Sequence, residues 1–181
     1  MKIALYLFIC IFSEGVWAGE FSAVVKNINV ELVVDHYELN ADIDYQLSPV
    51  AKEALQKGIA LTWSVLIKVE QQGRVWNSSV QSLAIECQIQ NHALLNLYSI
   101  KRLSTGERSV FSSLAGALNF ISKMRRVVIV DKQLIQPDKQ YHVAVKVKFK
   151  HEALPVPLRP FSYFNSQWAL SSYWILWPLQ N

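Results

Sequence analysis

The chain has 181 residues, of which 51% are apolar and 18% are charged, and its formal net charge is +4. This composition excludes an intrinsically disordered chain, and six glycines and six prolines are too few for a collagenous or low-complexity one. The 18 lysines and arginines are spread along the chain instead of forming a basic run, so we expect no nucleic-acid partner.

The first 18 residues have the layout of a secretory signal peptide. Lys2 precedes an unbroken apolar run over residues 3–12, and Ala18 ends a Val-Trp-Ala cleavage pattern. Ten helical residues rise only about 15 Å, roughly half of a bilayer core, so the run is short for a permanent span. We expect cleavage after about Ala18, export to the periplasm and one β-rich domain over residues 19–181, with a retained anchor as the alternative.

In the mature chain, apolar and polar residues alternate with the period of a β-strand over most of the length. The expected strands are two within residues 24–47, divided by a turn near 35–36, and then 59–70, 74–90, 94–103, 127–130, 141–150 and 167–177. A short helix is expected over 49–57, capped by Ser48 and ended by Gly58, and a second one begins at Ser112 or Ser113. Pro155, Pro157 and Pro160 predict a stiff extended link without a helix.

These elements predict a mostly-β (α+β) fold, an antiparallel β-sandwich or strongly bent sheet of seven to eight strands with two short helices. Most connections between the strands are short enough for hairpins, and a βαβ alternation is absent. The sequence therefore argues against a parallel nucleotide-binding fold.

The sequence contains no nucleotide-binding, zinc-protease, CxxC or GxSxG motif, so we expect no enzyme and no cofactor. The four histidines lack metal-ligand spacing, and no metal site is expected. Cys87 and His92 are conceivable as a nucleophile and its base. However, Cys87 shares a predicted strand face with apolar residues, which favours an inert core thiol.

Two charged stripes have two interpretations. Asp42 and Asp44 lie on the polar face of one predicted strand, while Lys146, Lys148 and Lys150 lie on that of another. If the strands are neighbours, the opposite charges pair with each other, which is the interpretation we favour. If they are not, the lysines form a basic surface for anionic headgroups or an acidic partner.

The C-terminal segment is unusually aromatic, and both faces of its predicted strand are apolar. Such a strand is either buried on both sides or offers one face to a partner. Arg159 either anchors a carboxylate or phosphate of that partner or makes a capping contact with the backbone. The candidate partner-binding residues are Arg159, Trp168, Tyr173, Trp174 and Trp177.

Two C-terminal blocks carry a family resemblance, Leu154-Pro155-x-Pro157-Leu158-Arg159 and Trp168-x-Leu170-x-Ser172-x-Trp174-x-x-Trp177. Further matching blocks are Leu47-Ser48 with Glu53-Ala54-Leu55 and Gly58-Ile59, Arg74-x-Trp76, residues 94–98, and Phe111-Ser112-Ser113-Leu114 with Ala117-Leu118. With them, nearly the whole mature chain resembles the proteobacterial family described as domain of unknown function 4390. The resemblance implies an exported protein without a known activity. Its members are often encoded beside a membrane sensor histidine kinase, which implies an envelope role.

Two functional hypotheses follow. The first is a non-catalytic periplasmic binding or accessory protein that docks a membrane sensor or another envelope partner through its C-terminal aromatic residues, with membrane-surface contact as a further possibility. The second is a carrier or sensor of a small hydrophobic ligand such as a lipid, enclosed by Trp63, Ile67 and the aromatic residues. The sequence leaves the oligomeric state open.

Overall fold

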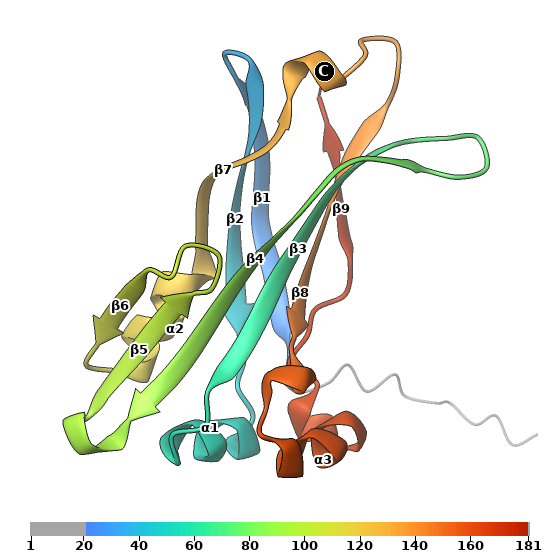
Figure 1. The fold of residues 1–181 in the computed structure, drawn as a ribbon. Coiled ribbons are helices and arrows are strands. Elements are labelled where there is room, and N and C mark those ends of the chain that lie inside the picture. Colours follow the sequence, from blue (N-terminus) through green and yellow to red (C-terminus); the bar gives the residue numbers. More distant parts are fainter. Residues whose placement is uncertain (1–20, 181) are drawn as a thin grey trace, which may run out of the picture.

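The computed structural model describes residues 21–180, which form two antiparallel sheets packed face to face (Figure 1). The predicted mostly-β, sandwich-like fold is confirmed. The described residues hold nine strands and three α-helices, so the prediction fell short by at least one strand and one helix. The expected signal peptide over residues 1–18 lies outside the described part.

The smaller sheet has three strands and the larger one has six. In spatial order, the small sheet consists of β1 (Ala23–Val33), β2 (His36–Tyr45) and β7 (Lys123–Asp131). The large sheet consists of β6 (Arg108–Phe111), β5 (Leu97–Arg102), β4 (Ser78–His92), β3 (Leu61–Gln71), β8 (Tyr141–Phe149) and β9 (Ile175–Leu179). The α-helices are α1 (Pro49–Gln56), α2 (Leu114–Ser122) and α3 (Arg159–Phe164).

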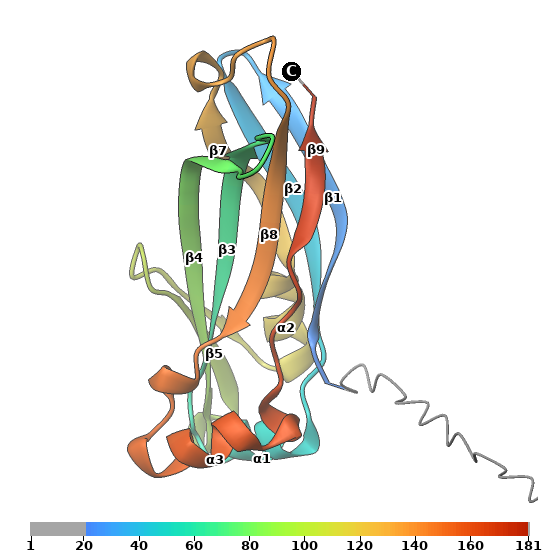
Figure 2. The same ribbon diagram turned by 90° about the vertical axis from the view of Figure 1, so that its right-hand side faces the viewer.

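The helices cover the lower end and one side of the sandwich. Helices α1 and α3 lie at its lower end, and α2 lies between the β5–β6 hairpin and the small sheet (Figure 1). On the other side, β1 of the small sheet runs beside β8 and β9 of the large one (Figure 2). Both predicted helix starts are capped as expected, because Ser48 Oγ accepts from the Ala51 amide at 3.0 Å and Ser113 Oγ from the Gly116 amide at 3.1 Å.

An aromatic cluster fills the sandwich core. Trp63 of β3 meets Tyr45 and Phe149 edge-on, with ring centroids 5.3 Å apart in both pairs, and Phe149 stacks on Trp168 at 5.8 Å. The indole nitrogen of Trp63 donates to the Leu170 carbonyl at 3.2 Å. This bond ties the C-terminal segment to the centre of the large sheet.

The C-terminal segment differs most from its prediction. The extended link expected over the prolines is wrong, because α3 begins at Arg159 and Pro160 lies in its first turn. Proline is tolerated there since a first-turn amide has no partner within the helix. The strand expected over 167–177 is confirmed only from Ile175, after a 3₁₀ turn over Ser166–Trp168. The short β6 strand was not predicted.

Two serines replace the missing strand pairing beside β8. Ser171 Oγ accepts a hydrogen bond from the Phe149 amide at 3.0 Å, and Ser172 Oγ accepts one from the Val147 amide at 2.8 Å. The Ser172 amide donates in turn to the Val147 carbonyl at 2.8 Å. Side chains therefore satisfy β8 backbone groups that a regular strand would otherwise pair.

All four sheet edges among residues 21–180 are irregular, short or carry a proline. In the small sheet, the register shifts along β1 and β7, and Asn27 and Arg126 have positive φ angles of 51°. In the large sheet, β6 has only four residues, and Pro178 lies within β9. These are recognised features of strands that do not pair further.

Candidate functional site

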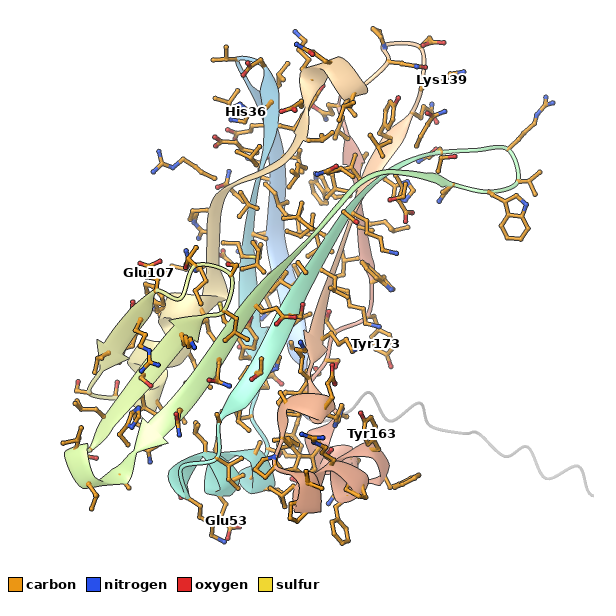
Figure 3. The ribbon with its side chains drawn as sticks, viewed as in Figure 1. His36, Glu53, Glu107, Lys139, Tyr163 and Tyr173 are labelled. Atoms are coloured by element: carbon orange, nitrogen blue, oxygen red, sulfur yellow. The ribbon has the colours of Figure 1, made fainter. Side chains whose placement is uncertain are left out.

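The structure separates the C-terminal aromatic residues into a buried group and an exposed group. Trp168 is only 4% exposed and belongs to the core, so it contributes nothing to a docking surface. Tyr173 is 86% exposed and projects from the segment before β9 (Figure 3). Trp174 and Trp177 are both partly exposed, but Trp177 pairs with Val143 and lies on the inner face of its strand.

Arg159 lies at the start of α3 and is exposed. Its Nε donates to the Leu154 carbonyl at 2.7 Å, which is the backbone capping contact that was one of its two predicted roles. This bond holds the guanidinium against its own chain, at the lower end of the sandwich and away from Trp174.

The outer face of the large sheet carries a cluster that we call the cationic tryptophan surface, formed by Lys68 of β3, Lys146 of β8 and Trp174. The Lys68 ammonium lies 5.0 Å from the Trp174 ring centroid, and that of Lys146 lies 5.8 Å from it. Each ammonium makes a cation–π contact, usually worth about 0.5–1 kcal/mol at an exposed site. Both cations share one ring, so they also repel each other.

Neither lysine of this surface has an acidic partner among residues 21–180. The neighbouring lysines of β8 do, since Lys150 pairs with Glu86 at 2.8 Å and Lys148 lies 3.9 Å from Glu152. Lys146 is therefore the uncompensated member of the predicted basic stripe of Lys146, Lys148 and Lys150.

The favoured interpretation, in which that stripe pairs with Asp42 and Asp44, is wrong. The two acids lie on β2, in the small sheet, while the lysines lie on β8 in the large one. Asp44 instead pairs with Lys26 at 3.0 Å, and Asp42 pairs with Arg125. These bonds lower the pKa of both carboxyl groups, that of Asp42 chiefly through Asn27 and then Arg125, and that of Asp44 chiefly through Lys26.

A shallow hollow of about 280 Å³ adjoins the cationic tryptophan surface. Leu66 and Lys68 of β3 line it together with Ser82 and Ala84 of β4. Lys68 belongs to both features, so an apolar site and two cations lie next to each other on one sheet face.

A second hollow, of about 300 Å³, lies between the two sheets beside α2, and we call it the inter-sheet pocket. It is lined by Tyr45, Val65, Ile85, Cys87, Arg102, Ser104, Thr105, Phe120, Ile121, Lys123, Met124, Arg125 and Val127. Trp63 and Ile67, the residues expected to enclose a hydrophobic ligand, are 1% and 0% exposed and do not line it. They belong to the filled core instead.

Cys87 and His92 lie on opposite faces of β4. Cys87 pairs with Trp63 on the inner face, and His92 Nε2 is bonded to Ser99 Oγ at 2.8 Å. Burial raises the pKa of the Cys87 thiol, and the Arg102 guanidinium opposes that shift only in part. The arrangement does not form a nucleophile–base pair.

Within 21–180, no group of three or more histidine, cysteine, aspartate or glutamate side chains has the arrangement of a metal site. No helix in the same range is both long and apolar enough to span a bilayer.

Sequence reasoning missed Lys68, which completes the cationic tryptophan surface. The alternation of apolar and polar residues over 59–70 places Lys68 on the polar face of β3. Its proximity to Trp174, however, depends on the strand order β3-β8-β9 in the large sheet. No local pattern in the sequence specifies that order.

Comparison with other proteins identifies a family but no characterised relative. No curated protein and no solved structure matches the chain. A family model matches residues 21–178, which covers both hollows, the cationic tryptophan surface and all nine strands except the end of β9. The chain belongs to the family described as a domain of unknown function, DUF4390.

Proposed function

We propose that this protein is an exported, non-catalytic binding module that docks an acidic segment of another periplasmic or membrane protein. The observation that carries the proposal is the contact of Trp174 with both Lys68 and Lys146, two cations without an acidic partner among the described residues. A carboxylate of a partner placed there relieves the repulsion between the two ammonium groups. Electrostatic complementarity of this kind favours both encounter and orientation.

The hollow beside Lys68 supports a protein partner. An apolar side chain of the partner fits over Leu66 and Ala84 while its acidic neighbour meets the lysines. Tyrosine and tryptophan are enriched in such interfaces, and Tyr173 and Trp174 stand at the border of this one. Docking occurs on the sheet face, because Pro178 obstructs the addition of a strand along β9.

The decisive experiment places a photo-crosslinking amino acid at Tyr173 in the full chain and crosslinks it in intact cells of the source organism. We expect a discrete protein adduct, which Lys68→Gln with Lys146→Gln abolishes. The matched control is Lys101→Gln with Arg108→Gln, which removes two cations on the same sheet face at the opposite edge. An adduct that survives loss of Lys68 and Lys146, or adducts with lipid alone, would contradict the proposal.

The export part of the proposal rests on the predicted signal peptide and is tested separately. We expect the protein in the periplasmic fraction, with Gly19 as its first residue in mass spectrometry. An intact N-terminus on a cytosolic protein contradicts export.

A further inference from the structure

The inter-sheet pocket combines an apolar interior with a basic opening. Val65, Ile85 and Met124 are among six apolar aliphatic, aromatic and thioether side chains that line it, whereas Arg102, Lys123 and Arg125 supply cations. No carboxylate side chain lines the pocket. Such a cavity resembles a ligand site in size and polarity, at the lower end of the usual range of roughly 300–1,000 Å³.

The three cations differ in how far they are already neutralised. Arg125 is fully engaged, since it bonds to Asp42 and donates to the carbonyls of Ala41 and Met124 at 2.8 Å. Arg102 lies 3.6 Å from Glu107, in the turn between β5 and β6 (Figure 3). Lys123 forms no ion pair within the described range, although it faces Asp42 across the β2–β7 pair and helps to lower the pKa of that carboxyl group. Lys123 and Arg102 are therefore the cations that remain for an anion at the pocket.

Tyr45 adds a hydroxyl group to the wall of the pocket. Tyr45 is only 9% exposed, and its hydroxyl makes no hydrogen bond to another residue of 21–180. Burial raises the pKa of this phenol, so the hydroxyl is a neutral donor at any physiological pH.

From these observations we infer that the inter-sheet pocket binds a single-chain amphiphile with an anionic head group. The hydrocarbon chain lies against Val65, Ile85 and Met124, and the head group is held by Lys123 and Arg102. This site is distinct from the cationic tryptophan surface, which lies on the opposite face of the large sheet, and the inference does not depend on the proposed function.

Cys87 supplies a direct readout of occupancy, because its thiol lies in the pocket wall beside Arg102. In the full chain carrying Cys10→Ser, it is the sole cysteine of the sequence. We expect decanoate to slow the modification of Cys87 by the neutral reagent N-ethylmaleimide severalfold at saturation. Decanol, which has the same chain without the charge, should protect far more weakly. These measurements use the unaltered pocket, so they do not depend on how a variant folds.

Calorimetric titration with decanoate then tests the head-group contacts. Lys123→Gln with Arg102→Gln should weaken decanoate binding about tenfold or more, since charge-assisted hydrogen bonds are lost. The control is Lys101→Gln, which removes the adjacent cation on the other face of β5 and should leave affinity within about twofold.

Three results would overturn the inference. The first is an absence of both decanoate binding and Cys87 protection. The second is equal binding of decanol and decanoate, which removes the role of the cations. The third is a loss of decanoate affinity in Lys101→Gln as large as in the double variant. That result indicates that the overall positive charge of the protein attracts decanoate, and not the cations of the pocket.

Discussion

Trp168 and Trp174 belong to the same aromatic segment but have opposite roles. Trp168 stacks on Phe149 in the core and is 4% exposed, whereas Trp174 lies on the outer sheet face, is 39% exposed and contacts two lysines. The sequence is rich in aromatic residues around both. What distinguishes the two tryptophans is the chemistry of the strands they meet, an apolar face in one case and a polar one in the other.

The largest expected effect is on Trp168. Trp168→Ala removes a buried indole and leaves a cavity beside Phe149, which should lower the free energy of unfolding by about 3–5 kcal/mol. Urea denaturation followed by circular dichroism measures the change. Phe164→Ala, at a side chain that is 93% exposed, is the control and should change stability by less than about 0.5 kcal/mol. Similar losses in both variants would erase the distinction between buried and exposed aromatic residues.

The next largest effect on stability is expected for the segment that connects the two tryptophans. Ser171→Ala with Ser172→Ala removes the hydroxyl acceptors of the Phe149 and Val147 amides. We expect a loss of about 1–3 kcal/mol, because buried amides without partners are costly. Hydrogen exchange should accelerate at those two amides first.

Ser166→Ala is the matched control for the serine pair. Its hydroxyl makes no hydrogen bond with another residue of the described range, and the change should leave exchange at β8 unaltered. If the double variant also leaves the β8 amides protected, the serines do not replace strand pairing.

A smaller effect depends on pH. His151 contacts Phe149 edge-on and stacks on Tyr163, so it borders the buried aromatic cluster. Burial lowers the pKa of His151 below its ordinary 6.5; the Glu152 carboxylate opposes this shift, and Lys148 adds to it. The unfolded chain then binds more protons than the folded one at mildly acidic pH. The contribution of His151 to the free energy of unfolding is therefore complete above about pH 6.5 and declines as the pH falls through that value.

This pH effect is measured by urea denaturation between pH 7.5 and pH 5 with His151→Gln as the comparison. His36 has the opposite sign, because Glu38 and then Asp35 raise its pKa, so its contribution is lost as the pH rises. Both proteins should therefore carry His36→Gln. Equal pH dependence with and without His151 would contradict the assignment.

The smallest expected effect on stability is that of Trp174→Ala. The change loses two exposed cation–π contacts and should cost at most about 1–2 kcal/mol, while the proposed photo-crosslinked adduct disappears. Urea denaturation and crosslinking yield are measured on the same preparation. If Trp174→Ala lowers the free energy of unfolding as much as Trp168→Ala does, Trp174 is a core residue, and this result contradicts its proposed docking role.

Local patterns predicted the fold better than the candidate site. Period-two alternation located β1, β2, β3 and β8 to within a few residues, because each has one buried face. Both caps were predictable since Ser48 and Ser113 act within one helical turn. The partners of Lys146 and Asp42 depend on which sheet each strand joins, and this is decided by long-range contacts that alternation does not encode.

The irregular sheet edges have a consequence for how copies of this chain behave together. An approaching strand finds no long, flat edge to pair with. Residues with positive φ interrupt β1 and β7, β6 is short, and β9 contains a proline. We therefore expect the folded protein to resist edge-to-edge strand pairing even though half of its amino acids are apolar. Its associations are then confined to side-chain surfaces, where recognition is selective.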